Sequence, residues 1–172
     1  MGMGSTVQQA GTTAANAMSG MTHYMQLLSE NQPWNLILFM AIPVIFAEFI
    51  AITELYILFT RNYASVWRRL NGIASIIVGF YFTGVFVYLF TNAVIPLTTQ
   101  GGWRGLADVV AVGFYLAGIV PLGGIALVEL RTWLSGKEAS ASMKVHAAFV
   151  AVFLVVAHVA MIFGMVDPRL LA

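Results

Sequence analysis

The chain alternates four long apolar segments with short polar connections. The apolar segments lie at about residues 35–60, 71–97, 106–131 and 144–166. A helix needs about 20 apolar residues to cross a hydrocarbon core of about 30 Å, so each segment predicts one transmembrane helix. Short connections place consecutive helices antiparallel to each other. We therefore expect an all-α integral membrane protein that folds as an up-down four-helix bundle.

Residues 1–34 form a separate N-terminal part, and residues 35–172 contain the transmembrane domain. The tail begins with small and polar residues and carries too little apolar surface there to fold alone. Apolar side chains then recur at helical spacings, at Met18, Met21, Met25 and Leu28. This spacing predicts a short amphipathic helix that lies on the outer membrane surface. Pro33 separates this helix from the first transmembrane helix.

Prolines and glycines modify three of the predicted membrane helices. Pro43 is expected to kink the first helix close to the level of Glu48, and the second helix is expected to end near Pro96. In the third helix, Pro121 stands between glycines and is expected to bend or loosen the backbone. The second helix also carries small side chains three to four residues apart, at Gly72, Ser75, Gly79 and Thr83. Such a stripe lets another helix approach closely.

Composition and charge support this interpretation and orient the helices. The chain is 60% hydrophobic and 9% charged, with a mean hydropathy of +0.87, which lies outside the range of soluble domains. Six of the eight basic residues lie in or beside the first and third connections, at Arg61, Arg68, Arg69, Arg131, Lys137 and Lys144. By the positive-inside rule these connections face the cytoplasm. We therefore expect a bacterial inner-membrane protein with both termini extracytoplasmic.

The sequence also excludes several classes of function. It contains no cysteine, which rules out disulfides, thiolate metal sites and thiol catalysis. It has no glycine-rich phosphate loop, no Ser-His-Asp order and no basic patch for nucleic acid. It leaves no room for a soluble catalytic domain, and we assign no catalytic residue. The expected partners are the lipid bilayer and either further copies of the chain or other subunits of a membrane complex. Four helices alone do not readily enclose a transport pathway, so an oligomer is favoured.

Five ionisable residues fall within the predicted membrane helices, where such residues are rare and mark functional sites. They are Glu48, Glu54, Glu129, His146 and His158. At a rise of about 1.5 Å per residue, Glu48 lies near the midplane at the depth of His158, and the other three lie nearer the cytoplasmic side. Glu48 and Glu54 are about 120° apart around the first helix and do not share a face. A charge at a helix centre costs about 2.5 to 3.5 kcal/mol, so Glu48 should be neutral, paired or bound to a cation.

Imidazole and carboxylate groups together are ligands for transition metals such as Cu, Fe and Zn. We therefore predict a metal site in which Glu48 and His158 are the central ligands. Glu54, Glu129 and His146 are expected to form an inner station for the same ion. The function that follows is that of a metal permease component or a metal-handling accessory protein.

An outer capture site for the metal is a further hypothesis. His23 stands among three methionines of the N-terminal segment, Met18, Met21 and Met25. Thioether and imidazole groups together suit Cu(I). The alternative is that these methionines form only the apolar face of the interfacial helix, since Met is a common filler of such faces.

Two other functions fit the same intramembrane residues. The chain can be a small subunit of a respiratory or other electron-transfer complex, in which Glu and His carry protons or help to bind a quinone or haem. Haem b is less favoured than a metal ion, because bis-histidine ligation needs a facing His and the first three predicted membrane helices contain none. The chain can also be a structural assembly factor, in which Glu54 and Glu129 pair with Arg61 and Arg131 at the membrane boundary.

Overall fold

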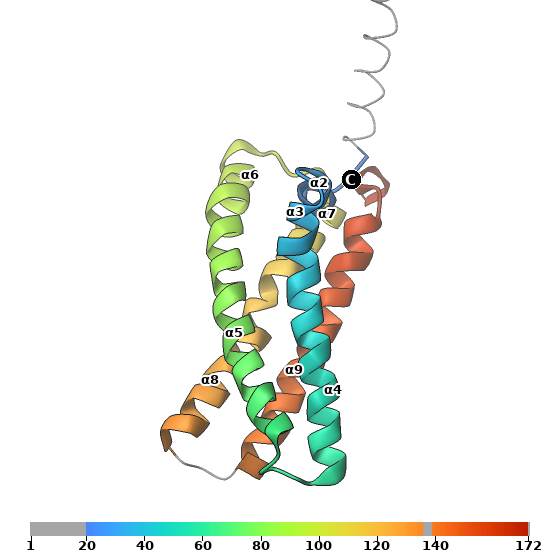
Figure 1. Cartoon of the computed structure of the whole chain (residues 1–172). Coiled ribbons are helices and arrows are strands. Elements are labelled where there is room, and N and C mark those ends of the chain that lie inside the picture. Colours follow the sequence, from blue (N-terminus) through green and yellow to red (C-terminus); the bar gives the residue numbers. More distant parts are fainter. Residues whose placement is uncertain (1–19, 136–138, 172) are drawn as a thin grey trace, which may run out of the picture.

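Four long helical spans run antiparallel to one another and form the body of the protein (Figure 1). The computed structural model describes residues 20–135 and 139–171, and no strand occurs among them. Each span is long and apolar enough to cross a membrane. The spans are Trp34–Thr60, Val66–Gln100, Leu106–Leu134 and Ser142–Met165. The predicted all-α four-helix bundle of an integral membrane protein is therefore confirmed.

The spans consist of shorter elements joined end to end. The first contains α3 (Trp34–Leu36), the π-helical segment η1 (Ile37–Ala41) and α4 (Ile42–Thr60). The second contains α5 (Val66–Leu89), the π-helical segment η2 (Phe90–Val94) and α6 (Ile95–Gln100). The third contains α7 (Leu106–Ala117) and α8 (Ile119–Ser135), and the fourth is α9 (Ala139–Met165). The short helices α2 (His23–Ser29) and η3 (Pro168–Leu171) precede and follow the spans.

Two of the prolines in the spans directly follow π-helical segments. Pro43 comes just after η1 and Pro96 just after η2, each in the first turn of the next α-helix. A proline has no N–H to donate and its ring collides with the preceding turn, and the wider π turn accommodates both effects without ending the helix. The second span therefore continues beyond the end that its sequence predicts. It stops at Gln100, where Gly101 adopts a left-handed conformation with a φ of 66°.

The third span is interrupted at Gly118, between α7 and α8. Pro121 offers no N–H to the carbonyl group of Ala117, so the regular hydrogen-bond ladder cannot continue through this turn. The Gly118 N–H instead reaches the carbonyl oxygen of Tyr115 at 3.2 Å. A Cβ at Gly118 would lie 3.2 Å from the ring of Phe82. The loosened backbone that the sequence predicts around Pro121 is therefore packed against the core.

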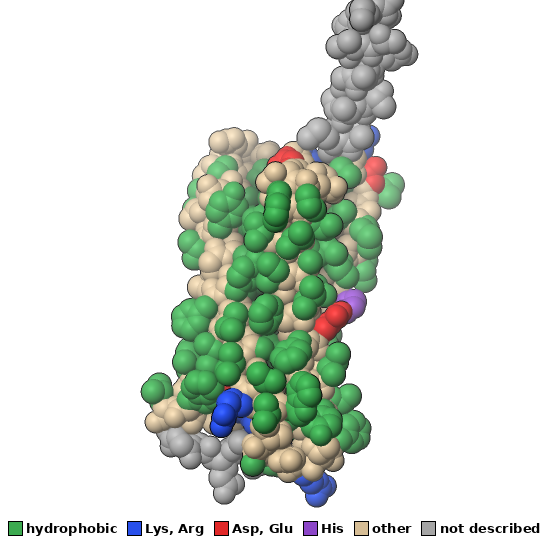
Figure 2. All heavy atoms as spheres, in the orientation of Figure 1, with side chains coloured by type: hydrophobic (Ala, Val, Ile, Leu, Met, Phe, Trp, Pro, Cys, Tyr) green, Lys and Arg blue, Asp and Glu red, His purple; other side chains and the backbone are tan. Residues whose placement is uncertain are grey.

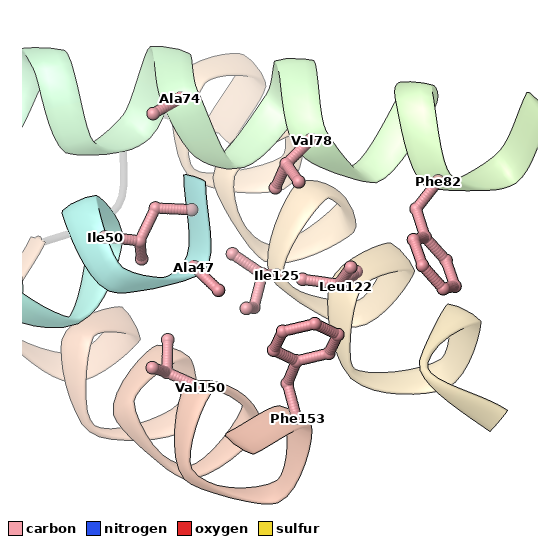
Figure 3. Close-up of a cluster of buried hydrophobic side chains, with 9 residues drawn as sticks. All are labelled: Ala47, Ile50, Ala74, Val78, Phe82, Leu122, Ile125, Val150 and Phe153. Atoms are coloured by element: carbon pink, nitrogen blue, oxygen red, sulfur yellow. The ribbon is translucent and has the colours of Figure 1, made fainter. Parts of the chain in front are cut away.

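An apolar cluster in the middle of the bundle draws side chains from all four spans (Figure 3). It consists of Ala47, Ile50, Ala74, Val78, Phe82, Leu122, Ile125, Val150 and Phe153. On one side of it α5 and α8 approach closely at Gly79, where an added Cβ would lie 2.4 Å from the Cβ of Ala126. The small-residue stripe of the second span thus serves the close helix contact that its spacing predicts.

The helix α2 lies across one end of the bundle, and Figure 1 shows it nearly end-on there. Its Tyr24 and Leu28 are buried in a second apolar cluster, and Thr22 donates a hydrogen bond to the carbonyl oxygen of Gly164 at 2.8 Å. Burial raises the pKa of Tyr24 to about 12, so its phenol stays neutral at physiological pH. The predicted short helix is present, and these two apolar side chains face the bundle.

The two ends of the bundle differ in charge. We call the end where α4 joins α5 the basic end, since Arg61, Arg68 and Arg69 lie there. The opposite end, which α2 covers, is the α2 end.

The close contact between α5 and α8 is testable at Gly79. We expect Gly79→Ala to lower the free energy of unfolding by about 1 to 3 kcal/mol, because the new methyl group overpacks the contact with Ala126. The matched control is Gly84→Ala on the same helix, where nothing lies within 4 Å of the added Cβ. That control should leave stability unchanged or raise it by up to about 1 kcal/mol through helix propensity. Thermal unfolding in detergent measures both, and equal stabilities would contradict the packing.

Candidate functional site: a buried ionic cluster shared by four helices

Each of the four long helices contributes one ionisable side chain to a single buried site near the basic end. The four residues are Glu54 of α4, Arg68 of α5, Glu129 of α8 and His146 of α9. All four side chains are buried, and those of Glu129 and His146 have no exposed surface at all. We call these four residues the inner cluster. Buried ionisable groups must be paired or neutral, so their mutual contacts decide their charge.

The imidazole of His146 lies at the centre of the inner cluster. Its Nδ1 atom is 3.1 Å from Oε1 of Glu54. On the opposite edge of the ring, Nε2 is 3.0 Å from the hydroxyl oxygen of Ser75 and 3.5 Å from Oε1 of Glu129. Both ring nitrogens are therefore in use, and the two carboxyl groups face different nitrogens.

Arg68 and Glu129 form an ion pair beside the imidazole. The Nη2 atom of Arg68 is 2.9 Å from Oε1 and 3.0 Å from Oε2 of Glu129. This pair occupies the space above Gly72, where an added Cβ would lie 2.9 Å from Oε2 of Glu129. A methyl group at this position would displace the carboxyl group of Glu129 from its place beside Arg68. The pair joins α5 to α8.

Neutral side chains fix the position of the cluster between α4 and α5. The amide nitrogen of Asn71 donates to the hydroxyl of Thr53 at 2.8 Å and to the carbonyl oxygen of Ile50 at 3.0 Å. The hydroxyl of Ser75 donates to the carbonyl oxygen of Asn71 at 2.7 Å. All of these residues are buried, and these hydrogen bonds compensate the donors for the loss of contact with water, whereas Oδ1 of Asn71 has no hydrogen-bond partner among the described residues.

The contact between Glu54 and His146 depends on the tautomer of the ring. Ser75 donates its hydrogen to the carbonyl group of Asn71, and in the tautomer with a hydrogen on Nε2 the same hydroxyl oxygen accepts from His146. Nδ1 and Oε1 of Glu54 then face each other at 3.1 Å. Two acceptors do not form a hydrogen bond, so one proton lies on either the carboxyl group or the ring nitrogen. With that proton, the positive charge of Arg68 and the negative charge of Glu129 leave the cluster neutral.

Glu48 and His158 also come together, at a different place. Both are exposed and both line a cavity of about 110 Å³ between α4 and α9. Figure 2 shows an acidic side chain and a histidine side chain on an otherwise apolar flank, about midway between the two ends. Nδ1 of His158 lies 2.6 Å from the carbonyl oxygen of Leu154 and donates to it. The pairing in depth that the sequence predicts for these residues is thus present in the structure.

The two intramembrane sites are separate. Along α4, Ile50 lies between Glu48 and Glu54, and along α9 Val150 and Phe153 lie between the two histidines, all in the central apolar cluster (Figure 3). Among the residues that the structure describes, no hydrogen bond or ion pair connects Glu48 or His158 with the inner cluster.

The residues of the hypothetical outer capture site hold α2 to the bundle. Nδ1 of His23 is 2.5 Å from Oδ2 of Asp108 on α7, and the backbone N–H of His23 donates to Oδ1 at 2.6 Å. The guanidinium of Arg104 donates to the carbonyl oxygen of Met21 at 2.6 Å. Met25 packs against the second apolar cluster. Met18 lies outside the described residues.

The described ranges contain no group of three or more His, Asp or Glu side chains arranged to hold a metal ion. In the inner cluster this follows from the position of the imidazole, which stands between the two carboxyl groups. An ion at one ring nitrogen meets only one of them without a rearrangement. Metal binding by these residues therefore stays a prediction.

Sequence reasoning missed the cation of the inner cluster and its neutral partners. The second helix begins at Val66 and not near residue 71, so Arg68 belongs to its first turn and points along the stripe of small residues. Glu129 pairs with Arg68, and Glu54 pairs with His146. The available signal was the spacing of Arg68, Gly72 and Ser75, which places all three on one face of a helix.

The dependence of the cluster on its cation is testable with two adjacent arginines. We expect Arg68→Ala to lower the free energy of unfolding by about 3 to 5 kcal/mol, because it leaves Glu129 buried without its counter-charge. Arg69→Ala is the matched control, since Arg69 is exposed, and it should change stability by less than about 0.5 kcal/mol. Chemical or thermal unfolding in detergent gives both values. Equal losses for the two variants would show that Glu129 does not need Arg68.

Comparison with known proteins places the chain in a family. No curated protein and no solved structure matches it. A family profile matches residues 18–172, which include α2, all four spans and every residue of the inner cluster. The chain therefore belongs to DUF6803, a family of unknown function.

Proposed function

We propose that the inner cluster holds and exchanges one proton inside the membrane, and that the chain is a small subunit of a proton-coupled or electron-transfer membrane complex. The observation that carries this proposal is the contact of 3.1 Å between Nδ1 of His146 and Oε1 of Glu54. In the tautomer with a hydrogen on Nε2 directed at Ser75, this contact holds one shared proton. The proton can lie on either partner.

The surroundings reduce the cost of moving this proton. Transfer from Glu54 to His146 creates a carboxylate and an imidazolium in a buried site, where separated charges are costly. The carboxylate of Glu129 faces the other ring nitrogen at 3.5 Å and stabilises the imidazolium. Arg68 pairs with Glu129 and holds its carboxyl group in place. The cluster thus has the groups that a reversible proton site needs.

Access to the site is expected from the basic end alone. Arg68 lies in the first turn of α5, directly after the connection from α4. Toward the other end, the central apolar cluster closes the bundle with Phe82, Leu122 and Phe153. The single chain therefore stores a proton near one membrane surface, and its described residues offer no polar path past the apolar cluster. Coupling to transport or electron transfer then requires other subunits, which is why we propose a component of a complex.

Transition-metal binding is a second proposal for the same residues. Its support is that the structure gathers five predicted ligands into two sites, Glu48 with His158 and Glu54 with His146 and Glu129. A metal ion at the inner cluster would have to replace the shared proton. One of the two carboxyl groups would also have to turn toward the ring nitrogen of His146 that the other carboxyl group faces. Elemental analysis of the purified protein distinguishes the two proposals, since stoichiometric Cu, Fe or Zn supports metal handling.

Proton exchange is testable by infrared difference spectroscopy of the purified protein in lipid. We expect spectra recorded across a pH series to contain the carbonyl stretch of a buried protonated carboxyl group, coupled to bands of the His146 imidazole. Glu54→Gln should abolish both signals, because the amide cannot exchange a proton with Nδ1. Glu30→Gln is the matched control, since Glu30 is exposed at the end of α2 and bonds only to a neighbouring amide in the described contacts.

If the spectra of Glu54→Gln and the unaltered protein are the same at every pH, no proton is exchanged at this contact. The inner cluster would then only hold the helices together, as the structural assembly factor requires.

A further inference from the structure

Glu48 and His158 lie on the part of the bundle that the chain itself covers least. Within the most apolar stretch of each span, 28% of residues are buried for Trp34–Thr60 and 22% for Ser142–Met165. The corresponding values are 39% for Val66–Gln100 and 50% for Leu106–Leu134. The neighbouring helices α4 and α9 therefore share an open flank, and the polar pair stands in its middle (Figure 2).

The exposed side chains of α4 and α9 match level by level. On α4, Glu48 has Ile45 on its α2 side and Ile52 on its basic side, and all three are exposed. The chain runs in the opposite direction along α9. There, Ile162 lies on the α2 side of His158 and Val155 on its basic side, and these are also exposed. Each helix thus presents one polar group between two large apolar side chains.

We propose that this flank binds a second copy of the chain, with Glu48 of each copy facing His158 of the other. Copies inserted in the same orientation are related by a two-fold axis along the membrane normal, and rotation about that axis keeps every residue at its depth. Glu48 and His158 line one cavity and share a depth, so this rotation brings unlike groups together twice. A flank with this property is self-complementary, as a two-fold interface requires.

The second copy supplies hydrogen-bond partners for the exposed Glu48 and His158. Nδ1 of His158 is engaged with the carbonyl oxygen of Leu154, so Nε2 is the atom that faces the carboxyl group of the other copy. The packing places Ile45 against Ile162 and Ile52 against Val155, and these contacts enclose the four polar groups in apolar surroundings. Lipid tails cannot form hydrogen bonds with the pair, whereas the other copy does. The contact also covers the mouth of the cavity behind the pair.

This interface is independent of the inner cluster, so its test and that of proton exchange can fail separately. The chain has no cysteine, which allows single reporters without a background. Two chains with different affinity tags, one carrying Ile52→Cys and the other Val155→Cys, are produced in the same membrane and oxidised. We expect a disulfide-linked dimer that carries both tags. The control is Leu127→Cys in both chains, exposed on α8, and it should remain unlinked.

The polar pair itself is tested in the same reporter chains. We expect Glu48→Leu, introduced in both, to lower the cross-linked fraction about tenfold, because each His158 loses its partner across the interface. The exchanged double variant Glu48→His with His158→Glu should restore cross-linking, since it preserves the pairing of unlike groups.

Three results would overturn the proposal. They are a lack of cross-linking between Ile52→Cys and Val155→Cys, cross-linking of the α8 control to the same extent, and an unchanged yield in Glu48→Leu. The first would show that lipid or a different membrane protein covers this flank. The third would show that the apolar side chains associate without the polar pair.

Discussion

The contact between the imidazole of His146 and its two carboxyl groups is the constraint on which the bundle depends. Each of the four long helices brings one ionisable group to this place, and none of the four groups can be buried at low cost without the others. Their meeting fixes the rotation and the height of every helix relative to its neighbours. Gly72 leaves the space for the ion pair, and Asn71 ties α4 to α5 beside it. Apolar packing alone does not fix the register so closely, because most apolar side chains can exchange neighbours.

The molecule is arranged in three levels along its axis. Charged and polar groups lie near the basic end, the apolar cluster of Figure 3 fills the middle, and α2 covers the other end through its contacts with Asp108 and Gly164. The exposed pair of Glu48 and His158 stands at the middle level on the outside. These two polar side chains are not needed for the fold of a single chain.

Much of this organisation follows from the sequence, because hydropathy and depth depend only on position along a helix. The spans follow from their length, and the grouping of Glu54 with His146 and of Glu48 with His158 follows from the rise per residue. The offset of about 120° between Glu48 and Glu54 likewise fits one exposed and one buried carboxyl group. The role of Arg68 did not follow, because it depends on where α5 begins and on which helices are neighbours. Neither is encoded in the periodicity of one segment.

The most direct test of the central claim is solid-state NMR of the protein in lipid, with ¹³C in the glutamate carboxyl groups and ¹⁵N in the histidine rings. The geometry predicts a strong dipolar coupling between Nδ1 of His146 and one carboxyl carbon, which disappears in Glu54→Gln, and a hydrogen on Nε2. A His146 ring without coupling to any glutamate carboxyl carbon would contradict the account. So would a coupling at Nδ1 that persists in Glu54→Gln.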